Sequence, residues 1–105
     1  MRVALIQNNP RFGKKEENIE HLFSLIEREE ADLYVLPELA YTGYQFVSKK
    51  EIEELSDSMD SSCIRAFKEK AVEREGAIVF GFPERAPEGF YNSSLAVLPN
   101  GQMIL

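Results

Sequence analysis

Short apolar runs separated by polar turn sequences predict five β-strands along the chain. The first two, Val3–Ile6 and Leu33–Leu36, are continuously apolar and short, so we expect them to be buried strands. Near the end of the chain, Pro99-Asn100-Gly101 carries the Asn-Gly pair that is typical of a hairpin turn. The later strands are expected over Ala77–Phe82, which Pro83 ends, then Tyr91–Leu98 and Gln102–Leu105.

Apolar residues at helical spacing predict two longer helices between these strands. The first is expected to begin near Glu16–Asn18 with Asn18 as its cap. The second is expected to begin at Asp60-Ser61-Ser62 and to end at Gly76, the glycine just past the helix, and a short acidic helix is expected within Ser48–Ser58. The expected buried positions are Ile19, Leu22, Phe23 and Ile26 in the first helix, and Ile64, Phe67, Ala71 and Val72 in the second.

The order of the elements defines the expected fold class. β-α-β-α-β followed by an antiparallel hairpin is typical of an α/β protein with a mixed sheet. The chain has 105 residues, which is enough for about one domain. Because the last strand stops four residues after its turn, we expect residues 1–105 to be part of a longer chain.

Charge and composition narrow the partners. Twelve Lys and Arg residues stand against eighteen Asp and Glu residues, a formal net charge of −6 that repels nucleic acid and anionic membranes. No apolar stretch approaches the roughly 20 residues that a membrane helix needs, and the first residues do not form a signal peptide. We therefore expect a cytoplasmic protein that binds neither nucleic acid nor membrane.

Glu38 is the first candidate for chemistry. It comes directly after the second predicted strand and its proline, and ligands of open α/β sheets gather at the carboxyl ends of the strands. The carboxylate is expected to pack among Leu36, Leu39, Tyr41 and Tyr44. Partial burial there would raise the pKa of the Glu38 carboxyl toward the value that suits a general base. The same position also suits a surface acid on a loop, or a cap for the turn that follows.

An ordered set of short motifs runs through the whole chain. The segments are Arg2–Gln7, Asn18, Ala31–Glu38, Gly43-Tyr44, Ala77–Gly81, Glu84, Tyr91-Asn92-Ser93 and Asn100-Gly101. In this order and spacing they resemble the N-terminal portion of the nitrilase superfamily, the carbon–nitrogen hydrolases that act on nitriles, amides and N-carbamoyl compounds. Leu-Pro-Glu followed by Gly-Tyr is the most specific part of the resemblance.

The resemblance implies an αββα sandwich whose chemistry uses a Glu-Lys-Cys triad and no cofactor. Glu38 matches the family's general base, and Tyr44 of the Gly-Tyr pair is a candidate substrate-binding residue. The family's lysine follows just beyond the hairpin that ends here, and its cysteine lies further along. Since amide and nitrile hydrolysis needs a thiolate and a stabilising cation as well as a base, the chain by itself is expected to be inactive. The resemblance also implies a small-molecule amide or nitrile substrate and a homo-oligomer.

Three other motifs offer weaker candidates. Cys63 lies in the first turn of a predicted helix, where the positive helix end can lower a thiol pKa, but the apolar stripe beside it indicates a packing helix. Lys14-Lys15 after Gly13 lacks the glycine and hydroxyl of a phosphate loop, so a solvated loop is expected. His21 is expected on a helix surface, because one histidine without clustered carboxylates makes no metal site.

Aromatic residues after Glu38 have two possible roles. Tyr41, Tyr44 and Phe46 either line a substrate pocket or pack their own loop. Asn92 in the Tyr-Asn-Ser motif is interpreted as structural, with its side chain hydrogen-bonded to a neighbouring loop.

Two further hypotheses stand beside the hydrolase. A short non-catalytic binding or assembly module with half of this fold would expose apolar faces and self-associate. A receiver or flavodoxin-like domain shares the element order. It would require clustered acids or a hydroxyl-rich loop after the first strand, where the chain has Gln7-Asn8-Asn9.

Overall fold

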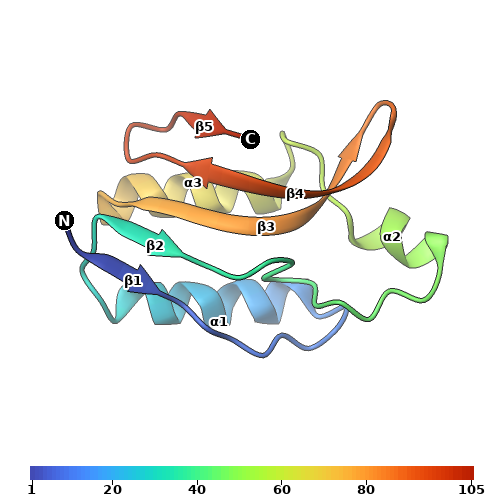
Figure 1. Ribbon diagram of the computed structural model, residues 1–105, viewed down its shortest axis with the longest axis horizontal. Coiled ribbons are helices and arrows are strands. Elements are labelled where there is room, and N and C mark those ends of the chain that lie inside the picture. Colours follow the sequence, from blue (N-terminus) through green and yellow to red (C-terminus); the bar gives the residue numbers. More distant parts are fainter.

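Five strands form one mixed sheet in the order β1-β2-β3-β4-β5 in the computed structural model, which describes residues 1–105 (Figure 1). Parallel pairing joins β1 to β2 and β2 to β3, and antiparallel pairing joins β3 to β4 and β4 to β5. The mixed α/β sheet predicted from the sequence is therefore confirmed. The strands are β1 (Val3–Leu5), β2 (Leu33–Val35), β3 (Ala77–Ala86), β4 (Gly89–Val97) and β5 (Met103–Ile104).

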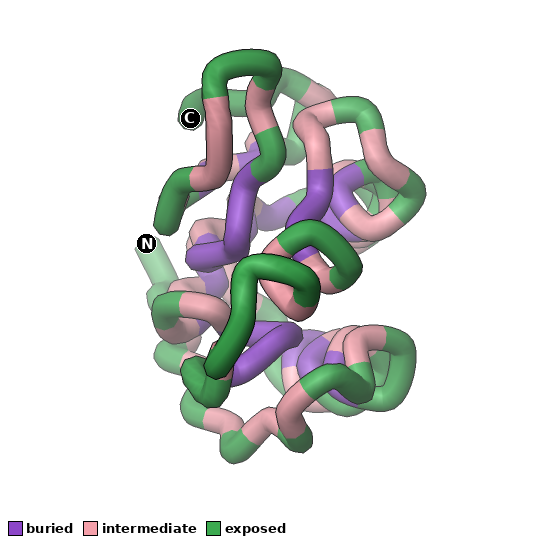
Figure 2. The backbone as a smooth tube through the Cα atoms, turned by 90° about the vertical axis from the view of Figure 1, so that its right-hand side faces the viewer, coloured by how far each residue is buried: buried purple, intermediate pink, exposed green.

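The helices lie in the predicted places. They are α1 (Lys15–Glu27), α2 (Lys49–Leu55) and α3 (Ser62–Arg74). Figures 1 and 2 show the two longer helices, α1 and α3, together on one face of the sheet, while the opposite face carries no helix. None of the three helices combines the length and the apolar character that a membrane crossing requires.

The hydrophobic core lies between the sheet and the two longer helices. Alternate strand residues point into it because successive side chains of a strand face opposite sides. Phe67 of α3 stacks on Phe80 of β3 with ring centroids 4.1 Å apart, and Phe23 of α1 meets Phe67 edge-on at 5.0 Å. The fully buried apolar residues include Leu22, Ile26, Tyr34, Ile64, Phe67, Ala71, Ile78, Phe80, Phe82, Leu95 and Val97.

The first strand, β1, is covered on one face only, so the prediction that it is a buried strand is wrong. Val3 is 51% exposed and Leu5 is 79% exposed, because both point away from the helices on an edge strand. Only the alternate residue Ala4 and the following Ile6 pack against the core. A continuous apolar run therefore does not guarantee that both faces of a strand are covered.

The first helix begins without the predicted side-chain cap. Asn18 lies inside α1 and is buried. Its side chain accepts a hydrogen bond from the backbone N of Arg11 and donates to the carbonyls of Arg11 and Tyr41, at 2.8–3.0 Å. The prediction of Asn18 as a cap is therefore wrong: its amide group instead ties two loops to the helix, because a buried amide needs partners for both ends.

The third helix has two departures from the expectation. Val72 is 47% exposed rather than buried. The left-handed residue after the helix is Glu75, with φ 53°, and the amides of Glu75 and Gly76 close the helix end onto Val72 and Ala71. Gly76 follows it, where a Cβ would lie 2.7 Å from the carbonyl oxygen of Ala31. The glycine is therefore required by a close approach and not by a positive φ.

The third strand continues through Pro83, so its predicted end at Phe82 is wrong. Pro83 pairs with Asn92 of β4, and its carbonyl accepts from the backbone N of Asp57 at 2.9 Å. The N and O of one strand residue point to the same side of the strand. The missing N–H of Pro83 thus lies on the edge away from β4, where it removes no ladder hydrogen bond.

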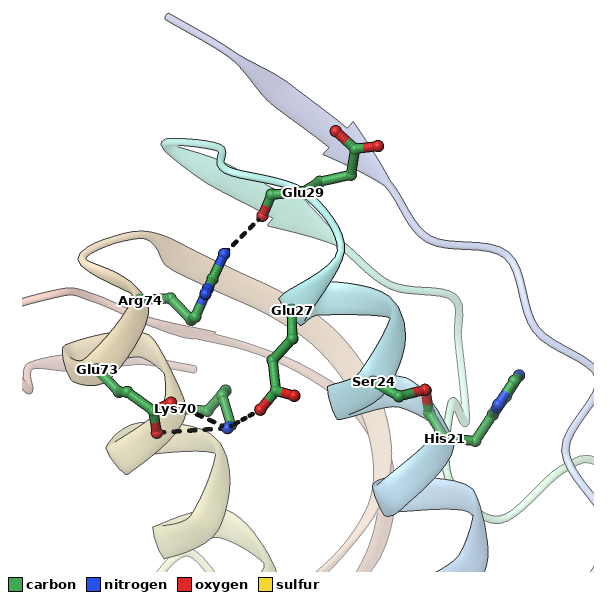
Figure 3. Close-up of polar contacts among 7 residues, drawn as sticks. All are labelled: His21, Ser24, Glu27, Glu29, Lys70, Glu73 and Arg74. Carbon is green, nitrogen blue, oxygen red and sulfur yellow. Dashed lines mark hydrogen bonds and ion pairs between the residues drawn. The ribbon is translucent and has the colours of Figure 1, made fainter.

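Charged side chains join the C-terminal halves of α1 and α3 (Figure 3). The Nζ of Lys70 contacts Oε1 of Glu27 at 2.7 Å and Oε2 of Glu73 at 3.3 Å. Arg74 donates to the backbone carbonyl of Glu29 at 2.9 Å. The hydrogen bond from Lys70 lowers the pKa of the Glu27 carboxyl. These contacts align the helices at the surface, where single ion pairs contribute little to stability.

Candidate active site

Glu38 lies at the carboxyl end of β2, over the open face of the sheet. It follows the strand after Leu36 and Pro37, in the position that open α/β sheets use for ligands. The neighbouring residue of β3 is Gly81, where a Cβ would come within 2.7 Å of the Glu38 Cα and 2.9 Å of the Leu39 N. A glycine at this place lets the backbone of Glu38 pass directly over β3.

Backbone hydrogen bonds hold the Glu38 segment against β3 beyond the end of the regular ladder. The N of Leu36 donates to Val79 O at 2.8 Å, the N of Gly81 to Pro37 O at 3.2 Å, and the N of Ala40 to Gly81 O at 3.1 Å. Glu38 therefore sits on a fixed backbone.

Leu39, the residue after Glu38, adopts φ 46°, a left-handed conformation that is costly for a residue with a Cβ. It coincides with the sharp turn that carries the chain away from β2. The hydrogen bonds to β3 on both sides of this turn keep the backbone in the costly conformation.

A shallow recess of about 230 Å³ opens beside Glu38. The Nδ2 of Asn92 on β4 donates to Oε1 of Glu38 across this recess. Its polar lining suits a hydrogen-bonding ligand. The residues that line it are Leu36, Glu38, Gly81, Asn92, Ser93 and Ser94.

The expected partial burial of Glu38 among Leu36, Leu39, Tyr41 and Tyr44 is wrong. Glu38 is exposed, and Tyr41 points to the helix side of the sheet, where it is fully buried. The ring of Tyr41 stacks on Phe67 with centroids 5.8 Å apart. The turn at Leu39 places Glu38 and Tyr41 on opposite sides, so the tyrosine supplies no desolvation to the carboxylate.

A buried polar cluster lies below Tyr41, away from Glu38. Asp57 accepts the Tyr41 hydroxyl at 2.8 Å and contacts the Nζ of Lys15 at 2.8 Å. The Lys15 ammonium also lies 5.7 Å from the centre of the Tyr41 ring. Burial first, and then the charge of Asp57, raises the pKa of the Tyr41 hydroxyl above its ordinary value, so the hydroxyl stays protonated and donates. This cluster joins the start of α1 to the segment before α3.

Cys63 lies on the helix-covered side of the sheet, as Tyr41 does. It is half-buried in the first turn of α3 and packs against the core. Burial, followed by the charge of Asp57, raises the pKa of its thiol above the ordinary value, although the Lys15 ammonium acts in the opposite direction. The idea that the helix end activates this thiol is therefore wrong, and the structure brings Cys63 together with Asp57 and not with Glu38.

The remaining sequence candidates lie at the surface. Tyr44 is 61% exposed on the loop after Glu38, outside the recess. Phe46 packs edge-on against Phe12, with ring centroids 5.1 Å apart. His21 is exposed on α1, and its ring points away from the ion pair of Glu27 and Lys70 (Figure 3). Lys14 is exposed just before the helix. No group of three or more His, Cys, Asp and Glu side chains is arranged to hold a metal ion.

Sequence reasoning missed two features of the site. The role of Gly81 in the close approach of Glu38 needs the pairing of two strands that are far apart in sequence. The partner of Asn92 was predicted only as a neighbouring loop, and the structure identifies it as Glu38. The only signal for either was the appearance of both residues within the family-like motifs.

The fold and the recess together define an α/β protein that presents one carboxylate at the carboxyl end of a parallel strand. A family model for carbon-nitrogen hydrolases matches residues 2–105. A nitrilase of Pyrococcus abyssi is 31% identical over 105 residues, which cover 96% of this chain and 40% of the relative. The protein N-terminal amidase of Saccharomyces cerevisiae is 28% identical over 113 residues, covering 99% of this chain and 25% of the relative.

Solved structures agree with the sequence comparisons. The crystal structure of an N-terminal amidase superposes with a TM-score of 0.89 at 27% identity, covering 99% of this chain and 26% of that one. A CN-hydrolase superfamily protein of Xanthomonas campestris gives a TM-score of 0.87 at 26% identity, covering 98% of this chain and 38% of that one. The chain belongs to the carbon–nitrogen hydrolase family, and it spans about a quarter to two fifths of the length of these relatives.

Proposed function

We propose that residues 1–105 are the N-terminal part of a single carbon–nitrogen hydrolase domain in which Glu38 is the general base. The observation that carries this proposal is the position of Glu38, fixed over Gly81 at the carboxyl end of β2 and beside a polar recess. Relatives named nitrilase and N-terminal amidase support a small amide or nitrile substrate. The same proposal places the protein in the cytoplasm and assigns Tyr44, on the loop after Glu38, to substrate contact.

The proposed reaction needs groups beyond Glu38. A thiol must attack the carbon of the amide or nitrile, and a cation must stabilise the charge that forms there. Glu38 takes the proton as the thiol attacks, and returns a proton to the departing nitrogen. Cys63 lies on the far side of the sheet from Glu38 and has a raised pKa. In this proposal Cys63 is therefore not the thiol, and residues 1–105 supply only the base of the reaction.

Ammonia release from amides and nitriles tests the proposal. The 105-residue chain is expected to show no turnover, while a longer natural protein that contains it is expected to be active. There, Glu38→Gln should lower kcat by about 10²- to 10⁴-fold, the usual contribution of a general base. Glu53→Gln, which changes an exposed acid on α2, is the matched control and should leave kcat unchanged. Turnover by the 105-residue chain, or full activity of Glu38→Gln, contradicts the proposal.

The open face of the sheet favours a second candidate, an assembly module. Val3, Leu5 and Ile104 are exposed apolar residues on strands that no helix covers on this side. Exposed apolar sheet faces and unpaired edges promote association. Such a module would be a stable oligomer without turnover.

Sedimentation velocity tests self-association through this face. The chain is expected to form oligomers as its concentration rises, because association removes apolar surface from water. Leu5→Lys should shift the chain toward monomer, since association through this face would bury the new ammonium group away from water. Ser24→Lys, on the exposed side of α1, adds the same charge away from the face and should leave association unchanged. A wild-type chain that stays monomeric at high concentration excludes this surface as an interface.

A further inference from the structure

Asn92 is the one side chain that hydrogen-bonds the carboxylate of Glu38. It lies on β4, 54 residues further along the chain, opposite Pro83 in the β3–β4 ladder. Its Nδ2 donates to Oε1 of Glu38, and Oε2 of Glu38 makes no hydrogen bond within the chain. The contact therefore distinguishes the two oxygens of the carboxylate.

The chemistry of the two groups fixes the direction of this hydrogen bond. An ionised carboxylate only accepts hydrogen bonds, while an amide offers both a donor nitrogen and an acceptor oxygen. The amide of Asn92 must therefore present its nitrogen to Glu38 while Glu38 is ionised. Because an amide neither gains nor loses a proton near neutral pH, Asn92 can hold one carboxylate oxygen without competing for the proton.

We propose that Asn92 is a positioning residue, which holds Oε1 of Glu38 so that Oε2 is the oxygen that exchanges protons during hydrolysis. The inference rests on the proposed role of Glu38 as general base. As the thiol attacks the substrate carbon, its S–H bond breaks and an O–H bond forms at Oε2. The same proton then passes to the departing nitrogen, and Glu38 returns to its ionised state. Asn92 takes no part in these transfers.

Residues of β3 and β4 together hold Glu38 with Oε1 bound and Oε2 free. Gly81 and the hydrogen bonds of β3 fix the backbone of Glu38, while Asn92 of β4 fixes the end of its side chain. A glutamate side chain has freely rotating bonds, and a base must lie within hydrogen-bond reach of its proton in a defined direction. A carboxylate anchored at both ends meets that requirement without a buried environment.

Nuclear magnetic resonance of the labelled 105-residue chain tests the contact directly. The side-chain amide signals of Asn92 are expected to move with pH as the carboxylate protonates, and to stop moving in Glu38→Gln. The side-chain amide of Asn100 is an internal reference, because it donates to the uncharged amide oxygen of Gln102 at 3.0 Å. The inference is overturned if the Asn92 side-chain signals do not shift with pH, or if they shift with pH by the same amount in Glu38→Gln.

Kinetics of an active protein that contains this chain tests the positioning role. Asn92→Ala is expected to lower kcat by about 100-fold, the order of loss that follows a small misplacement of a catalytic group, with KM unchanged. Ser24→Ala, which changes an exposed residue of α1 on the helix side of the sheet, is the control and should retain kcat. Unchanged kcat in Asn92→Ala overturns the inference, as does an equal loss in Ser24→Ala.

The NMR and kinetic experiments distinguish a failure of the positioning role of Asn92 from a failure of Glu38 as general base. If Glu38→Gln keeps full turnover, the proposed function fails even when the Asn92 signals respond to Glu38. If Glu38→Gln loses turnover and Asn92→Ala does not, only the positioning role fails.

Discussion

Replacing Lys15 with methionine is expected to lower the free energy of unfolding by about 3 kcal/mol, because it leaves a buried carboxylate without its cation. Asp57 is buried, and its partners in the chain include the Lys15 ammonium and the Tyr41 hydroxyl, each at 2.8 Å. Methionine keeps much of the length and apolar character of the lysine stem but carries no charge. Urea unfolding at neutral pH, followed by circular dichroism, measures the loss.

Two variants show whether the lost ion pair is the cause. Lys14→Met changes the adjacent lysine, which is exposed, and is expected to shift stability by no more than about 0.5 kcal/mol. Asp57→Asn in the Lys15→Met background removes the unpaired charge and should recover part of the loss. Equal effects of Lys15→Met and Lys14→Met would show that Asp57 does not depend on its cation.

Truncating Phe67 to alanine is expected to destabilise the fold by about 3–5 kcal/mol. The ring is fully buried at the centre of the core and contacts aromatic rings from α1, β3 and the loop after β2. Its removal leaves a cavity where three elements meet, and it also removes the stack on Phe80. The midpoint of thermal or urea unfolding measures the change.

Val72 is the matched control for Phe67, because it is an apolar residue on the same helix that is 47% exposed. Val72→Ala is expected to cost about 0.5 kcal/mol or less, since little apolar surface is lost and no cavity forms. If Phe67→Ala and Val72→Ala cost the same, the core does not centre on the aromatic stack between α3 and β3.

Both variants act on the helix side of the sheet, away from the recess beside Glu38. The aromatic stack and the Asp57 cluster hold α1 and α3 against β3, and β3 in turn carries Gly81 under Glu38. Stability and the candidate chemistry therefore lie on opposite faces of the same strand. The alternation of side chains along β3 makes this division possible.

Local pattern was sufficient for most of the element order. The apolar run Leu33–Leu36 ends at a proline, and the stripe of Ile19, Leu22, Phe23 and Ile26 has the period of a helix, so both elements were predictable. The hairpin at Asn100-Gly101 was predictable because its turn places Gly101 at a positive φ of 90°, a conformation that glycine adopts without strain. The predicted strand ends were wrong where a contact with a distant residue extends the strand. At Pro83, for example, the backbone carbonyl accepts a hydrogen bond from the backbone N of Asp57.

By itself, the sequence determined the strands, the helices, the mixed α/β order and the placement of Glu38 at the end of a parallel strand, because these depend on neighbours within a few residues. Only the tertiary structure decided which face of the sheet is covered. It also decided that Tyr41 turns toward Asp57 and that Glu38 meets Gly81 and Asn92. These contacts join residues 16 to 54 positions apart, and strand pairing and side-chain direction in three dimensions determine them, so no local pattern encodes them.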